Sequence, residues 1–266
     1  MTKLPKKILF FLRTNLSETI AFVIAMVGSL VAFWFAQQKD LLLLSSLVLA
    51  LTLYLMVIVV KRVGKDFYFI FFEDDRDIKD WIGNGSFKYY PKGKAFLIKE
   101  SEAGFLYSKC FGWVDYEFSL DFKILNQYLG VIFRAADQSN YVMLQMGKNG
   151  IRPHIRANGG WIAKEAAEFG LVYDKPFNEG EWYKLTINLT SNSVNIKLSN
   201  QNNSSVFDRN WDILTGVISI PIRDKDDKEK IVGILDTHVN YAYGTLGFRN
   251  VAGEQALVKN LLIKKI

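Results

Sequence analysis

Two long apolar runs near the start of the chain constrain it more than any other feature. They extend from Ile20 to Ala36 and from Leu41 to Val60, and only four residues separate them. At about 1.5 Å of rise per residue, a helix over the second run would be about 30 Å long, which is the thickness of a bilayer's hydrocarbon core. The sequence therefore predicts a transmembrane helical hairpin within residues 15–62, with helices over about 18–37 and 41–60, and the lipid bilayer is a predicted partner.

Basic residues flank the outer ends of this predicted hairpin, whereas its link contains only one. They are Lys3, Lys6, Lys7 and Arg13 before it, Lys61, Arg62 and Lys65 after it, and Lys39 in the link. The positive-inside rule then predicts a two-pass protein whose termini and C-terminal part are cytoplasmic, with residues 1–14 as a basic segment along the headgroups. A cleaved signal peptide is disfavoured, because no small-x-small pattern follows the first run.

Small residues form a stripe along the first predicted helix. Their spacings of three and four residues place them on one helix face, where another helix can approach closely. They are Ala21, Ala25, Gly28, Ala32 and Ala36. The packing partner is either the second helix or another molecule, namely a membrane protein or a second copy of this chain.

The remainder of the chain is electrically neutral. Of 33 Lys and Arg and 27 Asp and Glu, the first 65 residues contain 8 and 2, and the rest contain 25 of each. A neutral domain has no overall attraction for phosphates, so nucleic acid is not an expected partner. The single cysteine, Cys110, excludes an internal disulfide.

From about Phe67 the sequence changes to short segments rich in aromatic and β-branched residues, many of which alternate with polar ones. This texture predicts an all-β sandwich of two sheets over residues 67–266. The predicted strands are 116–125, 130–135, 141–146, 151–157, 182–189, 193–198, 244–249 and 257–264. The charged run Arg223 to Lys230 is expected to be a solvated loop within an insertion at about 207–243.

The order of these strands resembles the concanavalin A-like jelly-roll superfamily, especially its laminin-G-like and 3-keto-disaccharide hydrolase-type domains. Three stretches carry the resemblance: DYEFSLDFKILNQYLGVIFRAADQSNYVMLQM from Asp115, GEWYKLTINLTSNSVNIKLSN from Gly180, and GTLGFRNVAGEQALVKNLLIKK from Gly244. The resemblance implies a jelly-roll fold and a connection with sugars. In the last stretch Val258 and Lys259 precede Asn260, where the family usually has an aromatic residue and Asp.

No catalytic constellation is recognisable. The nearest match to the paired carboxylates of a glycosidase strand is Glu73, Asp75 and Asp77, which we interpret as an acidic turn. His154 and His238 have no accompanying nucleophile motif or metal-ligand spacing. We therefore predict no enzyme, no catalytic residue and no cofactor.

A calcium site at Asp224, Asp226 and Asp227 is disfavoured, because lysines are interleaved with the carboxylates. We therefore predict no metal ligand.

The best candidate site follows from strand alternation. In the strand from Tyr141, the side chains of Val142, Leu144 and Met146 should point one way and the intervening ones the other. The resulting candidate ligand-binding residues on a concave face are Arg134, Tyr141, Gln145, Arg152, His154, Arg156 and Trp161. Their donors and aromatic rings suit a sugar or a peptide. The alternative is that they merely line a filled or wet face, with Arg134 paired to a carboxylate.

These observations predict a membrane-anchored, non-catalytic jelly-roll module that binds a ligand or protein partner at the membrane surface. One alternative is a carbohydrate-binding or sugar-acting protein that faces outside. The other is a structural subunit of a membrane protein complex.

Overall fold

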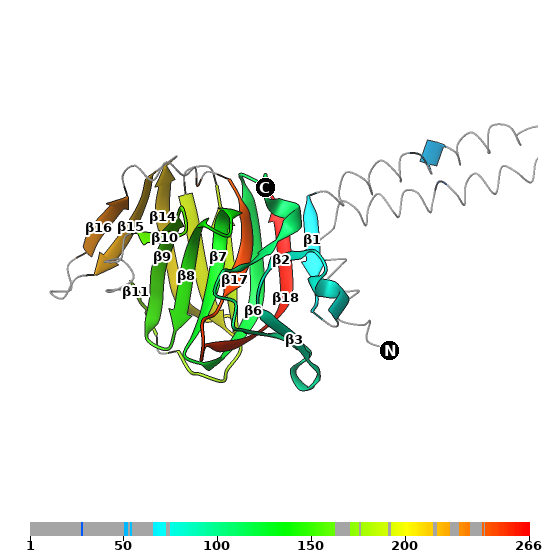
Figure 1. Ribbon diagram of the computed structural model, residues 1–266, viewed down its shortest axis with the longest axis horizontal. Coiled ribbons are helices and arrows are strands. Elements are labelled where there is room, and N and C mark those ends of the chain that lie inside the picture. The colour runs from blue at the N-terminus through cyan, green and yellow to red at the C-terminus, as the bar shows by residue number, and fades with distance from the viewer. Residues whose placement is uncertain are drawn as a thin grey trace, which may run out of the picture. The chain divides into compact units, whose positions relative to one another are not determined.

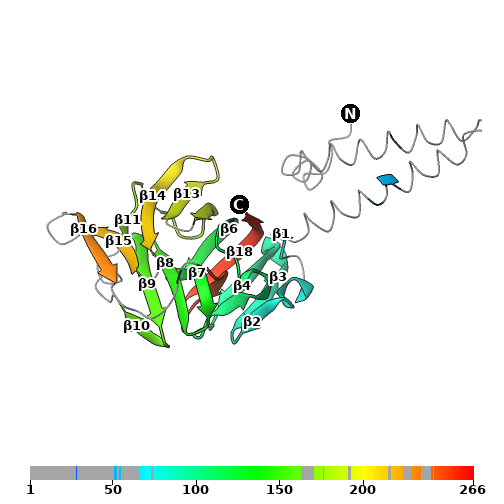
Figure 2. The same cartoon turned by 90° about the horizontal axis from the view of Figure 1, so that it is seen from above.

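The computed structural model divides the chain into two compact units, residues 1–67 and 68–266. It describes Gly28, Leu51, Thr52, Tyr54 and then residues 66–72, 75–162, 171–175, 177–190, 193–214, 217–223, 229–234, 241 and 243–266. The second unit is an all-β sandwich of two antiparallel sheets, of the jelly-roll kind (Figure 1, Figure 2). The predicted two-sheet β-sandwich is therefore confirmed.

The first sheet has ten strands within the described ranges. In spatial order they are β16 (Glu229–Ile234), β15 (Val217–Arg223), β14 (Ser205–Leu214), β13 (Ser193–Asn200), β12 (Tyr183–Leu189), β6 (Tyr116–Asn126), β18 (Gln255–Lys265), β4 (Ala95–Lys99) and β3 (Ser86–Tyr90), with β1 (Phe67–Ile70) also paired to β18. The neighbours β6 and β18 are more than a hundred residues apart in the chain, so non-local pairing builds the centre of this sheet.

The second sheet has eight strands among the residues described, and it carries the candidate site. In spatial order they are β10 (Gly160–Ile162), β9 (Gly150–Ala157), β8 (Asn140–Gly147), β7 (Tyr128–Asp137), β17 (Thr245–Arg249), β5 (Phe105–Tyr107) and β2 (Trp81–Gly83), with β11 (Leu171–Val172) also paired to β9. Figure 1 shows β7, β8 and β9 side by side. Short 3₁₀ helices occur at η2 (Asp75–Ile78), η3 (Pro91–Gly93) and η4 (Ser108–Cys110).

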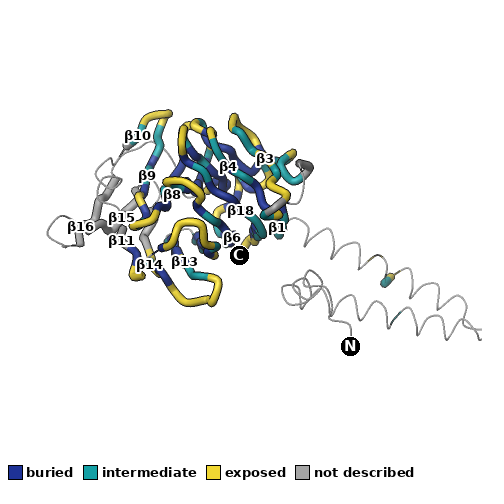
Figure 3. The backbone as a smooth tube through the Cα atoms, turned by 90° about the horizontal axis from the view of Figure 1, so that it is seen from below, coloured by how far each residue is buried: buried dark blue, intermediate teal, exposed yellow. Residues whose placement is uncertain are grey.

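The core lies between the sheets and follows the period of two that a strand imposes. On β12, Leu185, Ile187 and Leu189 are buried, whereas Thr186 and Asn188 between them are only partly buried. Figure 3 shows buried residues along the strands and exposed residues at connecting turns. Each strand predicted from alternation is present, with ends that differ by at most a few residues.

The segment expected to be an insertion differs from the prediction. Strands β14, β15 and β16 extend the first sheet through antiparallel pairing, in which Ile218 lies opposite Ile234 and Arg223 opposite Glu229. The ends of the charged run Arg223 to Lys230 thus lie in paired strands. Backbone hydrogen bonds hold an edge strand even where its side chains are charged, so charge alone did not distinguish strand from loop.

The predicted membrane hairpin is contradicted. In the part of the chain that the structure describes, no helix combines the length and the apolar character that crossing a bilayer requires. The prediction of a two-pass integral membrane protein with cytoplasmic termini is therefore wrong, and so is the part of the family resemblance that joined a transmembrane hairpin to the sandwich. Most of residues 1–14, 18–37 and 41–60 lie outside the described residues.

The predicted small-residue stripe is represented by Gly28 alone, since Ala21, Ala25, Ala32 and Ala36 lie outside the described residues. A methyl group added at Gly28 would lie 3.6 Å from the Thr52 Oγ1, which is ordinary van der Waals contact. The role of the stripe in helix packing stays a prediction.

Candidate functional site

Strands β8 and β9 position the polar residues of the candidate site on the outer face of the second sheet. Tyr141 lies opposite Arg156, and Gln145 lies opposite Arg152. The alternate residues Val142, Leu144 and Met146 belong to the main core, as do Ile151 and Ile155 on β9. The predicted alternation of these two strands is thus confirmed.

A second apolar cluster forms the floor of this outer face. Its buried members are Leu106, Ile132, Ala135, Tyr141 and Met143, each at most 1% exposed. Phe111 and Trp161 are partly buried and pack against it. The outer face is therefore not simply a solvated surface, because its polar side chains pack on this buried apolar cluster.

Trp161 on β10 lies at the centre of the site. Its ring is edge-to-face with His154, at 5.4 Å between ring centroids, and with Tyr141, at 6.0 Å. The guanidinium carbons of Arg156 and Arg249 lie 5.7 and 4.8 Å from its ring centroid. Both are cation–π distances, so two positive charges and two aromatic groups surround one indole.

The contact between Arg249 and Trp161 shows that side chains converge over the middle of this sheet. β17 and β10 are four strand-to-strand steps apart, which would be about 19 Å in a flat sheet. The position opposite Arg249 on β7 is Gly130, and a methyl group there would meet the Arg249 carbonyl oxygen and the Met143 Sδ. The absence of a side chain at Gly130 therefore lets β7 and β17 approach and leaves room above them.

A hydrogen-bonded chain runs beside the indole. Gln145 Nε2 donates to Glu254 Oε1 at 2.6 Å, and Glu254 Oε2 accepts from the Val251 amide at 2.9 Å. His154 Nε2 lies 3.3 Å from Gln145 Oε1. Because that amide oxygen can only accept, His154 Nε2 carries the hydrogen and Nδ1 is left as an acceptor.

Burial shifts the pKa values of the two titratable groups in this hydrogen-bonded series, His154 and Glu254. The pKa of His154 is lowered to about 4, first by burial and then by the charges of Arg249 and Arg152. The pKa of the Glu254 carboxyl, which is 2% exposed, is raised by burial and partly restored by its hydrogen bonds. His154 is therefore a neutral imidazole at pH 7.

The structure brings together Tyr141, Gln145, His154, Arg156 and Trp161, as the sequence predicted. Arg156 also donates from Nη1 to Tyr141 Oη at 3.3 Å. Arg152 is exposed at the margin of the same face, with its guanidinium carbon 5.3 Å from the Tyr128 ring centroid.

Arg134 does not belong to this surface. Its φ of +53° and the register shift between Phe133 and Asp137 mark a bulge in β7, which turns its side chain away from the outer face. The guanidinium is fully buried and donates to the carbonyls of Val114 and Thr190. Since Thr190 follows β12 of the other sheet, Arg134 joins the two sheets through backbone carbonyl acceptors. The charge of Asp115 also acts on its guanidinium.

Sequence reasoning missed Arg249 and Glu254. Both lie within the last of the stretches that carry the family resemblance, but their distance along the chain gave no link to β8 and β9. Only the pairing of β17 with β7, next to β8, connects them to the site.

The acidic residues considered for catalysis do not form a carboxylate-bearing strand. Asp75 and Asp77 lie in the 3₁₀ helix η2, where alternation between two faces does not apply, and Glu73 lies outside the described residues. His238, Asp224, Asp226 and Asp227 also lie outside them. Among the side chains that are described, no group of three His, Cys, Asp or Glu could hold a metal ion.

Comparisons with known proteins give only distant structural likeness. No protein-family model matches the chain, and no curated protein matches it. Carbohydrate-binding module CBM66 from Bacillus subtilis is 17% identical with a TM-score of 0.43, over 70% of this chain and 96% of that one.

Two other solved structures are similar to the same degree. A Bacillus subtilis protein of unknown function with a galectin-like fold is 12% identical with a TM-score of 0.48, over 74% of this chain and 94% of that one. The exoplasmic/lumenal domain of VIP36 in a Ca²⁺/Man3GlcNAc-bound form is 9% identical with a TM-score of 0.45, over 74% and 88%. These likenesses are remote, and the site rests on the geometry of this chain alone.

Proposed function

We propose that the protein is a non-catalytic carbohydrate-binding protein whose ligand lies over Trp161 on the outer face of the second sheet. The observation that carries this proposal is the convergence of Tyr141, His154, Arg156 and Arg249 on a single indole. Together with Trp161, these residues come from four different strands, so the sheet itself fixes their spacing.

The chemistry of this cluster suits a sugar. A sugar ring has an apolar face of C–H groups and a rim of hydroxyls, which need an aromatic surface and directional donors and acceptors at the same time. Trp161 is partly buried on the apolar floor, and His154 and Arg156 beside it remain partly exposed. The free His154 Nδ1 would accept a hydrogen bond from a hydroxyl, and the arginines would donate to one.

The carboxylate of the site argues for binding rather than turnover. Glycoside hydrolysis normally needs two carboxyl groups that flank the scissile bond. Among the described residues of the cluster Glu254 is the one carboxylate, and both its oxygens are engaged by Gln145 and Val251. Its role is to hold Gln145 and, through it, His154.

The test uses the full chain on an array of polysaccharides and oligosaccharides, followed by titration calorimetry with the ligand found. Trp161→Ala should weaken binding by about tenfold or more, as is usual for loss of a stacked aromatic. The matched control is Trp182→Ala, because Trp182 also has a cation over its ring, Lys259 Nζ at 3.9 Å, but is associated with the first sheet. Equal losses in the two variants, or no binding to any glycan, would refute the proposal.

A further inference from the structure

Three arginines concentrate positive charge at the candidate site. Arg152, Arg156 and Arg249 lie on or beside it, and within the described ranges none of their guanidiniums forms an ion pair with a carboxylate. Two of the three also have their charge directed at Trp161. Glu254 is the one buried acidic group beside them. It accepts hydrogen bonds from Gln145 and Val251, and the charge of Arg249 acts on it without an ion pair.

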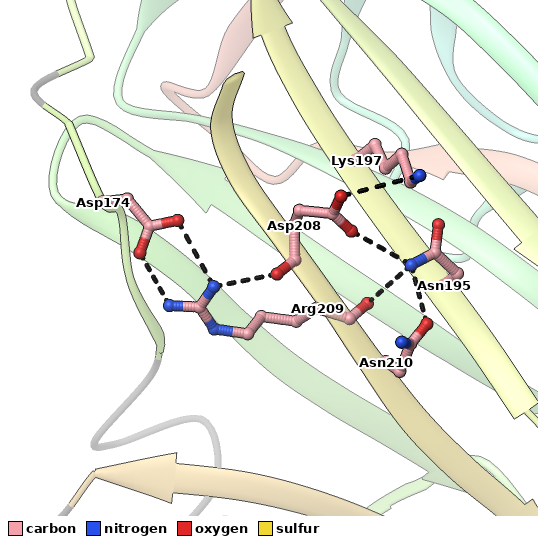
Figure 4. A network of polar contacts seen from close by, with 6 residues as sticks. All are labelled: Asp174, Asn195, Lys197, Asp208, Arg209 and Asn210. Atoms are coloured by element: carbon pink, nitrogen blue, oxygen red, sulfur yellow. Dashed lines mark hydrogen bonds and ion pairs between the residues drawn. The ribbon is translucent and has the colours of Figure 1, made fainter.

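Another surface of the same molecule shows the opposite arrangement (Figure 4). On β14, Arg209 makes a two-pronged contact with Asp174, at 2.6 and 3.3 Å, and Lys197 lies 3.6 Å from Asp208. These two surface cations on the first sheet thus have acidic partners. By contrast, Arg152, Arg156 and Arg249 have no carboxylate partner of this kind among the described residues.

The guanidiniums at the site retain donors for a ligand. Arg249 uses Nε to donate to the Glu102 carbonyl at 2.8 Å, and Arg156 uses Nε for the Gly159 carbonyl and Nη1 for Tyr141. No described acceptor engages the terminal nitrogens of Arg249. A guanidinium whose Nε is fixed presents its terminal N–H groups in a set direction, which suits the two oxygens of a carboxylate.

We propose that the ligand is an acidic sugar, whose carboxylate is bound by Arg249 and Arg156 while its ring packs on Trp161. This inference rests on the proposed function and adds the chemical class of the ligand. The same positive charge contributes to the lowered pKa of His154, which keeps a neutral hydrogen-bonding group beside the charged ones. A neutral sugar would give these arginines no charged partner when it displaced their water.

The experiment measures binding of the full chain to galacturonate oligomers and to galactose oligomers of the same length. The acidic oligomer should bind at least about tenfold more tightly, and Arg249→Gln should weaken its binding by about tenfold to a hundredfold, the range for a hydrogen bond to a charged group. Arg249→Lys keeps the charge but not the paired N–H donors of the guanidinium, and it should give an intermediate loss of affinity. Arg209→Gln, the matched control on the first sheet, should leave binding unchanged. Thermal unfolding of each variant checks that it is folded.

The remaining outcomes show whether the acidic ligand alone, or the carbohydrate function as well, is wrong. Equal affinity for both oligomers, with binding still lost in Trp161→Ala, would overturn the acidic ligand and leave the carbohydrate function standing. Binding of polyglutamate as tight as that of the galacturonate oligomer would show that charge alone is recognised and would overturn both. Absence of binding to either oligomer, with another neutral glycan bound at Trp161, would overturn the acidic ligand only.

Discussion

Replacing Asn250 with alanine should lower the free energy of unfolding by about 2–6 kcal/mol. Asn250 is fully buried where the chain passes from β17 toward β18. Its Nδ2 donates to the Tyr128 carbonyl at 3.1 Å, and its Oδ1 accepts from the Gly130 amide at 3.2 Å. A weaker contact at 3.5 Å reaches the Ile98 carbonyl on the other sheet.

The magnitude follows from the groups that the substitution leaves behind. Alanine would strand a buried amide and a partly buried carbonyl of β7, and each unsatisfied buried group costs about 1–3 kcal/mol. The matched control is Asn195→Ala, since Asn195 Nδ2 also makes several hydrogen bonds, to Asp208 at 3.1 Å and to Asn210 at 2.7 Å (Figure 4). Water can replace these exposed partners, so this variant should lose less than about 1 kcal/mol.

The assay is urea unfolding of the full chain, monitored by tryptophan fluorescence. The dependence of the free energy of unfolding on urea concentration is fitted with one slope for all variants. Folded secondary structure in the absence of urea is checked by circular dichroism. If Asn250→Ala and Asn195→Ala shift the transition by the same amount, burial does not determine the worth of these amide hydrogen bonds, and the reasoning fails.

The His154 imidazole should titrate with a pKa of about 4 in the folded protein, against 6.5 as its ordinary value, because burial and then Arg249 and Arg152 oppose its charge. The unfolded chain therefore binds the proton more readily than the folded protein does. The contribution of His154 to stability is complete above pH 6.5 and is lost as the pH falls toward 4. NMR titration should show that Arg249→Gln raises the pKa of His154, and a pKa near 6.5 in the parent protein would contradict the prediction. Gly244→Ala should abolish or severely weaken folding, because Gly244 has a φ of +139° and an added methyl would lie 2.6 Å from the Ala135 carbonyl oxygen. Gly180→Ala, at a φ of +80° with open space around it, should cost only about 1 kcal/mol, and equal melting temperatures of the two variants would be inconsistent with this argument.

The strands around the site could be predicted from the sequence because alternation is a local property. Val142, Leu144 and Met146 had to share one face of any strand that contained them, and the intervening residues had to share the other. Hydropathy was a weaker guide. It measures the preference of side chains for apolar surroundings but not what provides them, and the predicted membrane-spanning helices are absent from the described part of the chain.

The tertiary structure alone decided which residues meet at the site. A bulge at Arg134 sent a predicted ligand-binding side chain between the sheets, and no pattern in the sequence marks that bulge. The pairing of β17 with β7 brought Arg249 over Trp161 from about ninety residues away. The sequence by itself determined the two faces of each strand through the period of the backbone, whereas the order of the strands, and with it the charge around the indole, arose from long-range pairing that no local pattern encodes.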